Sequence, residues 1–200
     1  MLRATILTGI ILFSAPYAVG QDVVSPKPDI ANGGDAAYSN ECLALSYRLL
    51  DGWKFGKISQ ASANQQSSQQ MKLFRVKRRS ESGSAESLEV DVMQTPTLKH
   101  PNMERFTILL ALSLTHTGPA AYKITRDAYP VTIAGRSFYR SDLRSGDNAI
   151  SIIATWYRGY AVTAWATAAS PVELDDAANA LGALSFGEDK RTAECFGSTN

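Results

Sequence analysis

The segment from Ala149 to Thr167 limits the possible folds most, because it predicts a β-hairpin that is apolar on both faces. Arg158-Gly159 at its centre suits a two-residue turn, since glycine accepts the positive φ that such turns require. Strands that are apolar on both faces lie inside a sheet and are covered on both sides. The predicted register pairs Ile152 with Trp165 and Trp156 with Ala161 on one face, and Ile153 with Ala164, Thr155 with Val162 and Tyr157 with Tyr160 on the other.

Alternation of apolar and polar residues predicts further strands on the N-terminal side of this hairpin. The longer ones are expected at 42–49, 71–79, 88–95, 130–134 and 138–144, with shorter strand patterns at 53–55 and 122–126. In the clearest of them, Leu88, Val90 and Val92 face one way while Glu89 and Asp91 face the other. The longer segments and the hairpin together make about seven strands, mostly in antiparallel connection.

Two helices are predicted at separate points of the chain. The first follows Pro101 and ends before Gly118, with an apolar stripe of Phe106, Leu109, Leu110 and Leu114. The second begins with a capping box in which the Ser170 hydroxyl accepts from the backbone N–H of Glu173, and its inward residues are Val172, Ala178, Leu181 and Leu184. We therefore expect an α+β fold, an antiparallel sheet of about seven strands with helices on both faces.

The N-terminus has the order of a secretory signal peptide over residues 1–20. Arg3 precedes an apolar run from Ile6 to Phe13, and the small residues of Ala18-Val19-Gly20 suit cleavage. That run is well short of the ~20 residues that a membrane-spanning helix needs. We expect a secreted or periplasmic protein with a flexible linker at 21–40, a single domain at 41–200 and no membrane span after cleavage.

Cys42 and Cys195 are the two cysteines of the chain and lie near the ends of the predicted domain. In an oxidising compartment such a pair most simply forms one disulfide. The alternative is a reactive or metal-binding thiol, but neither residue has a Cys or His nearby at ligand spacing. We therefore predict a structural bridge.

The chain resembles the PsbP-like family, named for the extrinsic oxygen-evolving protein of photosystem II. Three stretches carry the resemblance, which are the LSYRLLDGW sequence at 45–53, VTIAG at 131–135 and YRGYAV at 157–162. It covers most of 42–186 and implies a PsbP-like α/β/α sandwich that acts as a non-catalytic binding or assembly module. It supplies no active-site residues. The chain departs from the family in the Ser/Gln-rich segment after Phe55 and in its cysteine pair.

Charge suggests one candidate binding surface. Removing the signal lowers Lys plus Arg from 20 to 19, equal to the 19 Asp plus Glu, so no global field favours nucleic acid. A local cluster nevertheless includes Lys72, Arg75 and Lys77. Its functional interpretation is contact with an anion, an acidic polymer or a membrane headgroup. The structural interpretation, which we favour, is pairing with Glu89 and Asp91 on the neighbouring strand and protection of a sheet edge.

The hairpin tip is the second candidate surface. Tyr157 and Tyr160 flank Arg158, and tyrosine and arginine are enriched in binding hot spots. Most of this aromatic surface is expected to belong to the core.

The sequence contains no phosphate-binding glycine loop, dinucleotide fingerprint or HExxH motif. His100 and His116 are separated by a predicted helix and cannot share a metal, so we expect no metal and no cofactor. The leading hypothesis is an exported non-catalytic module that binds a protein or small-molecule partner in the envelope. The alternative is a small extracellular hydrolase whose residues converge only in three dimensions, in a pocket with one of these histidines, an acid and a serine.

Overall fold

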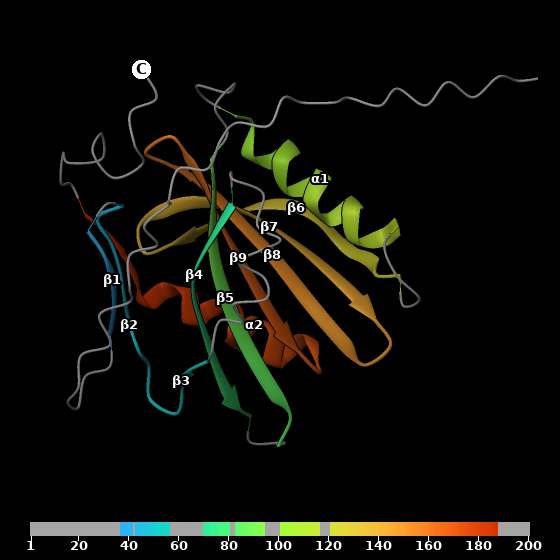
Figure 1. Cartoon of the computed structure of the whole chain (residues 1–200). Helices are drawn as coiled ribbons and strands as arrows, with labels where there is room; N and C mark the ends of the chain where they lie inside the picture. Colours follow the sequence, from blue (N-terminus) through green and yellow to red (C-terminus); the bar gives the residue numbers. More distant parts are fainter. Residues whose placement is uncertain are drawn as a thin grey trace, which may run out of the picture.

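The computed structural model describes residues 37–41, 43–56, 70–80, 83–94, 101–116 and 121–187. Figure 1 shows its strands and helices. In chain order they are β1 Ala37–Asn40, β2 Leu45–Arg48, β3 Lys54–Phe55, β4 Gln70–Arg79, β5 Ala85–Gln94, α1 Met103–His116, β6 Lys123–Ile133, β7 Arg136–Ser145, β8 Asn148–Tyr157, β9 Tyr160–Ala168, α2 Pro171–Asn179, a short 3-10 helix Ala180–Ala183 and β10 Leu184–Phe186. None of the helices described is long and apolar enough to cross a membrane.

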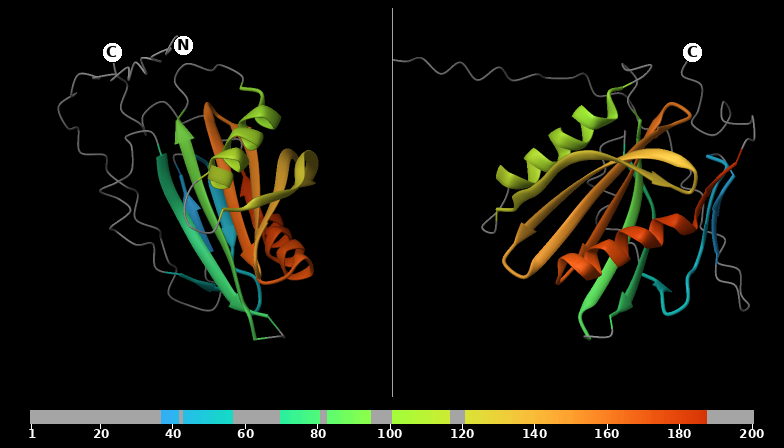
Figure 2. Two further views of the ribbon diagram at one scale, coloured as in Figure 1. Left: turned by 90° about the vertical axis from the view of Figure 1, so that its right-hand side faces the viewer. Right: turned by 180° about the vertical axis from the view of Figure 1, so that it is seen from behind.

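The main sheet has seven strands in the order β3-β4-β5-β9-β8-β7-β6, and all neighbours are antiparallel. A helix covers part of each face, as the sequence predicts. In Figure 1 α2 lies behind the strands, and in the view from behind in Figure 2 it crosses in front of them. The α+β sandwich with helices on both faces is thus confirmed.

The hairpin of β8 and β9 occupies the interior of this sheet with the predicted register. Ile152 lies opposite Trp165, Ile153 opposite Ala164 and Tyr157 opposite Tyr160. Ile152 and Ile153 are both fully buried although they point to opposite faces. Both faces are therefore packed, which explains why the hairpin sequence lacks a polar side.

Each face has its own core. On one side, Ile153, Val162 and Ala164 join the largest hydrophobic cluster, which includes Leu174 and Ala177 of α2. On the other side, Ile152 and Ala154 belong to two smaller clusters that α1 covers through Ala111 and Met103. The two helices therefore enclose the central hairpin between them.

The structure corrects three predicted helix positions. Leu184, expected as an inward residue of the second helix, is buried but belongs to β10. Leu109 was expected in the apolar stripe of α1, but it is 57% exposed, and Met103, Thr107 and Ala111 are buried instead. Val172 was expected to pack inward and is 75% exposed. At 3.6 residues per turn, Val172 lies about 200° around the helix from buried Leu174, so it points away from the sheet. The Ser170 cap itself is confirmed, since its side chain accepts from the Glu173 N–H.

A three-stranded sheet of order β1-β2-β10 was not predicted. The predicted strand at 42–49 belongs to this sheet as β2, and residues 37–40 of the predicted linker form β1. Tyr38 and Tyr47 pack on Phe74 of the main sheet, with ring centroids 4.9 and 4.6 Å away. The linker therefore ends earlier than expected, because β1 completes a small sheet that covers β4.

Several predictions fall on residues that the structure does not describe. These are the signal peptide at 1–20, the linker up to residue 36, most of the polar segment after Phe55, and both Cys42 and Cys195. The disulfide and the cleavage site stay predictions.

Candidate functional site

The predicted hairpin-tip patch is largely internal. Tyr157 and Tyr160 are 5% and 9% exposed, so both rings pack in the core rather than offering surface to a partner. The Tyr157 hydroxyl donates to the carbonyl oxygen of Gly187 at 2.7 Å, and Arg158 Nη2 donates to the same oxygen at 3.3 Å. Burial also raises the pKa of Tyr160. These contacts anchor the chain after β10 to the hairpin.

The predicted basic cluster on β4 is only partly neutralised. Lys72 forms an ion pair with Glu89, with 2.6 Å between Nζ and Oε1, as the structural interpretation expects. Asp91 instead accepts from the indole N–H of Trp165 at 3.2 Å. Arg75 and Lys77 are exposed. Neither has an ion pair within the described part of the chain.

The histidines give the hydrolase hypothesis no site in the described structure. His116 is exposed at the end of α1, where its Nδ1 lies 2.7 Å from the Thr115 hydroxyl and 2.9 Å from the Leu112 carbonyl. His100 lies outside the described residues. Among the described residues, no three acidic, His or Cys side chains are grouped to hold a metal.

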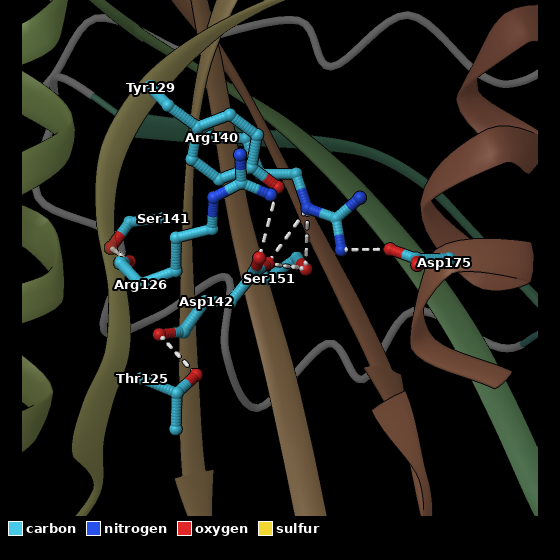
Figure 3. Close-up of polar contacts among 8 residues, drawn as sticks. All are labelled: Thr125, Arg126, Tyr129, Arg140, Ser141, Asp142, Ser151 and Asp175. Carbon is cyan, nitrogen blue, oxygen red and sulfur yellow. Dashed lines mark hydrogen bonds and ion pairs between the residues drawn. The ribbon is translucent and has the colours of Figure 1, made fainter. Parts of the chain in front are cut away.

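The densest group of polar side chains lies under α2, and Figure 3 shows it. Arg140 is 9% exposed, and its Nε donates to Asp142 at 2.7 Å and to the Ser151 hydroxyl at 3.1 Å. Its Nη2 reaches Asp175 of α2 at 2.6 Å. Asp142 also accepts from the Ser151 hydroxyl and, at 3.0 Å, from the Tyr129 hydroxyl.

This Arg140–Asp142 network has a structural role, because it holds α2 on the sheet. The carboxylate of Asp142 accepts hydrogen bonds from three side chains, so its lone pairs are engaged within the protein. Burial alone would lower the pKa of Arg140, but its bonds to Asp142 and Asp175 raise it overall. Burial, together with the charge of Asp142, raises the pKa of Tyr129 to about 12. The network links β6, β7 and β8 to α2.

A more accessible feature surrounds the first residues of β7. Two open cavities, of about 520 and 550 Å³, share Arg136 and Ser137 in their walls. The first lies between the β6–β7 turn and β10. The second lies between β7, β8 and the beginning of α1, and its walls include Met103, Tyr139 and Trp156. Tyr157 and Phe186 belong to the cluster that α2 covers, whereas Met103, Tyr139 and Trp156 belong to a cluster on the α1 side. The two cavities therefore lie on different faces of the sheet, and we call the first one the Arg136 groove.

Arg136 is held in place by aromatic rings. Its guanidinium carbon lies 4.8 Å from the ring centroid of Tyr157 and 4.7 Å from that of Phe186. Such cation–π contacts fix the plane of the guanidinium and leave its N–H groups free to donate. Within the described residues, no carboxylate pairs with it. The groove thus presents a preoriented cation beside apolar and aromatic surface, an arrangement suited to an anionic group.

Sequence reasoning missed Arg136 because nothing in its neighbourhood distinguishes it. It follows the turn Ala134-Gly135 and reads as an ordinary polar residue at the start of a strand. Its aromatic partners lie 21 and 50 positions further along the chain, as their residue numbers show. The folded arrangement of β7, β8 and β10 creates the site.

Comparison with known proteins identifies the fold. No family model and no curated protein sequence matches the chain. The solution structure of cyanobacterial PsbP (CyanoP) from Synechocystis sp. PCC 6803 superposes with a TM-score of 0.51 at 12% identity, covering 82% of this chain and 99% of that one.

Two other solved structures are more distant. LpqN, involved in cell envelope biogenesis of Mycobacterium tuberculosis, matches with a TM-score of 0.43 at 10% identity over 78% of this chain and 86% of its own. The Ran-binding protein Mog1p of Saccharomyces cerevisiae gives 0.41 at 12% identity over 76% and 95%. TM-scores below 0.5 do not establish a shared fold. The likeness to CyanoP establishes the fold alone, and the chain has the PsbP-like fold that its sequence resembles.

Proposed function

We propose that this protein is an exported, non-catalytic binding or assembly module that takes an anionic group of its partner in the Arg136 groove. The observation that carries the proposal is the guanidinium of Arg136, which lies against the contacting rings of Tyr157 and Phe186 and has no carboxylate partner among the described residues. An arginine whose orientation is fixed in advance loses little side-chain freedom when it binds, which favours affinity.

The groove also supports a ligand that is apolar beside its charge. Phe186, which is half-buried, lines the groove beside Arg136. Aromatic and arginine side chains supply much of the binding energy in recognition sites. A carboxylate attached to an apolar or ring-bearing group, on a small molecule or on a partner protein, therefore fits best. Export rests on the signal sequence at 1–20, and N-terminal analysis of the protein from its native compartment should find the chain beginning near residue 21.

Titration of the mature protein with benzoate, succinate and phosphate tests the site. The measurement is the NMR signal of the Arg136 Nε–H together with the backbone amides of Ser137 and Ser185, which line the groove. We expect saturable shifts with benzoate that are larger than those with phosphate, because only benzoate also contacts the aromatic wall.

Arg136→Gln should remove the shifts at Ser137, since it deletes the charge and keeps a polar side chain. Arg105→Gln is the matched control, because Arg105 is equally a single arginine and is exposed on α1. Unchanged spectra with all three anions, or equal shifts in the wild type and Arg136→Gln, would contradict the proposal.

A further inference from the structure

A row of cations lies on the side of β4 that faces away from α2. Arg75, Lys77 and Arg79 alternate along the strand with buried Val76 and with Arg78. Lys54 of β3 stands opposite Lys77 in the register, so it lies on the same side. All four cations are exposed. We call Lys54, Arg75, Lys77 and Arg79 the β4 basic row.

The acids that the structure describes on the neighbouring strand are engaged with other residues. Glu89 stands opposite Arg75 in the register, but its ion pair is with Lys72. Glu86 projects to the α2 side, where it pairs with Arg78 at 2.9 Å. Across the described ranges, none of the four cations in the row has an ion pair. Pairing with acids on the neighbouring strand, which the sequence analysis favours, therefore occurs for Lys72 but for none of the four cations of the row within the described residues.

The like charges of the β4 basic row destabilise the folded protein. Like charges directly opposite each other in an antiparallel pair are destabilising, and Lys54 and Lys77 are such a pair. Charges on an edge strand do discourage pairing between molecules. Charges of either sign would prevent such pairing, but the β4 basic row contains only positive charges. A negatively charged partner would convert the repulsion into attraction.

The shape of the surface favours an extended chain over a flat bilayer as the partner. Alternate residues of a strand are about 6.6–6.8 Å apart, so Arg75 to Arg79 form a straight row of about 13 Å. On the same side of the sheet α1 covers β6, β7 and β8 and rises by about the 10–12 Å diameter of a helix. A flat bilayer approaching this side meets α1 first. An extended chain can lie along β4 beside the helix.

We propose that the β4 basic row binds a linear acidic polymer, a chain with closely repeated phosphate or carboxylate groups. This site is separate from the Arg136 groove, because β4 is the second strand of the sheet order and β7 the sixth. The proposal therefore stands or falls independently of the anion site at Arg136.

The test measures binding of the mature protein to fluorescently labelled long-chain polyphosphate and to labelled polygalacturonate, over a range of NaCl concentrations. Vesicles of phosphatidylglycerol form a third arm. We expect binding to at least one polymer and its loss by tenfold or more in the variant Arg75→Gln/Lys77→Gln/Arg79→Gln. Each cation that displaces counterions from a flexible polyanion contributes about 0.7 to the slope of log K against log salt. The slope should therefore become shallower by about 2 in this variant.

The control variant Arg105→Gln/Lys123→Gln/Arg144→Gln removes the same charge from other exposed positions, and it includes another like-charged pair, since Lys123 stands opposite Arg144. It should bind within about twofold of the wild type. Should the β4 variant fail to fold, Lys54→Gln/Lys77→Gln replaces it, because it removes a repulsion. Equal losses in the β4 and control variants, binding to vesicles alone, or no binding to either polymer would overturn the proposal.

Discussion

Replacing Arg140 with leucine tests whether the network under α2 fastens the fold. The guanidinium is the hub of this network, since it contacts Asp142 and Ser151 in the sheet and Asp175 on α2. Leucine keeps part of the buried apolar stem and deletes every one of these contacts. Asp142, whose side chain is 14% exposed, then loses its ion-pair partner.

The size of the effect follows from the burial of each partner. Removing one member of a buried ion pair costs about 3–5 kcal/mol, because the remaining charge stays desolvated. Asp142 retains hydrogen bonds from Ser151 and Tyr129, which places the loss near the lower limit, at about 3 kcal/mol. Asp175 is 64% exposed, and ion pairs of exposed groups contribute about 0.2–1 kcal/mol. For a domain of this size, the loss corresponds to a Tm lower by about 6–12 °C.

Urea unfolding followed by tryptophan fluorescence measures the free energy of unfolding. Asp175→Asn is the matched control and should cost less than about 1 kcal/mol. Arg140→Lys keeps the charge but not the planar fork, so its loss should fall between the two. A loss of unfolding free energy below about 1 kcal/mol for Arg140→Leu, or an equal loss for Asp175→Asn, would refute the structural role of the network.

Three further predictions concern the core and the covalent structure. Ile153→Ala should cost about 2–5 kcal/mol because it empties a fully buried position in β8, whereas Val172→Ala, at a 75% exposed site, should change the free energy of unfolding by less than about 0.5 kcal/mol. Burial raises the pKa of Tyr47 to about 12, so Tyr47 and Tyr129 should be among the last tyrosines to ionise in a spectrophotometric titration. Because the folded pKa of Tyr47 exceeds the unfolded value of 10.0, the stability that it contributes should be present below pH 10 and decline between about pH 10 and 12, and Tyr47→Phe should make this decline smaller. Thiol titration of the denatured, unreduced protein should find no free thiol if Cys42 and Cys195 are bridged, and two free thiols would exclude the bridge.

The main sheet could be predicted from the sequence because its signals are local. The apolar faces of β8 and β9 and the turn at Gly159 fix the register of that hairpin, and the Ser170 cap fixes the start of α2. These features depend on residues within one turn or one strand of each other. The three-stranded sheet escaped prediction because β1, β2 and β10 are short and come from opposite ends of the domain.

The candidate sites show the same division. The sequence identified the basic character of β4 but not which cations are paired, because long side chains reach diagonal as well as opposite neighbours: Lys72 stands opposite Asp91 yet pairs with Glu89. Arg136 gave no signal at all.

The sequence by itself therefore determined most strands of the main sheet, the central hairpin and the two covering helices, since hydrophobic periodicity and turn chemistry act over short distances. Only the tertiary structure decided which charges stay unpaired and which rings Arg136 lies against. Those outcomes depend on which distant segments the closed sandwich brings into contact.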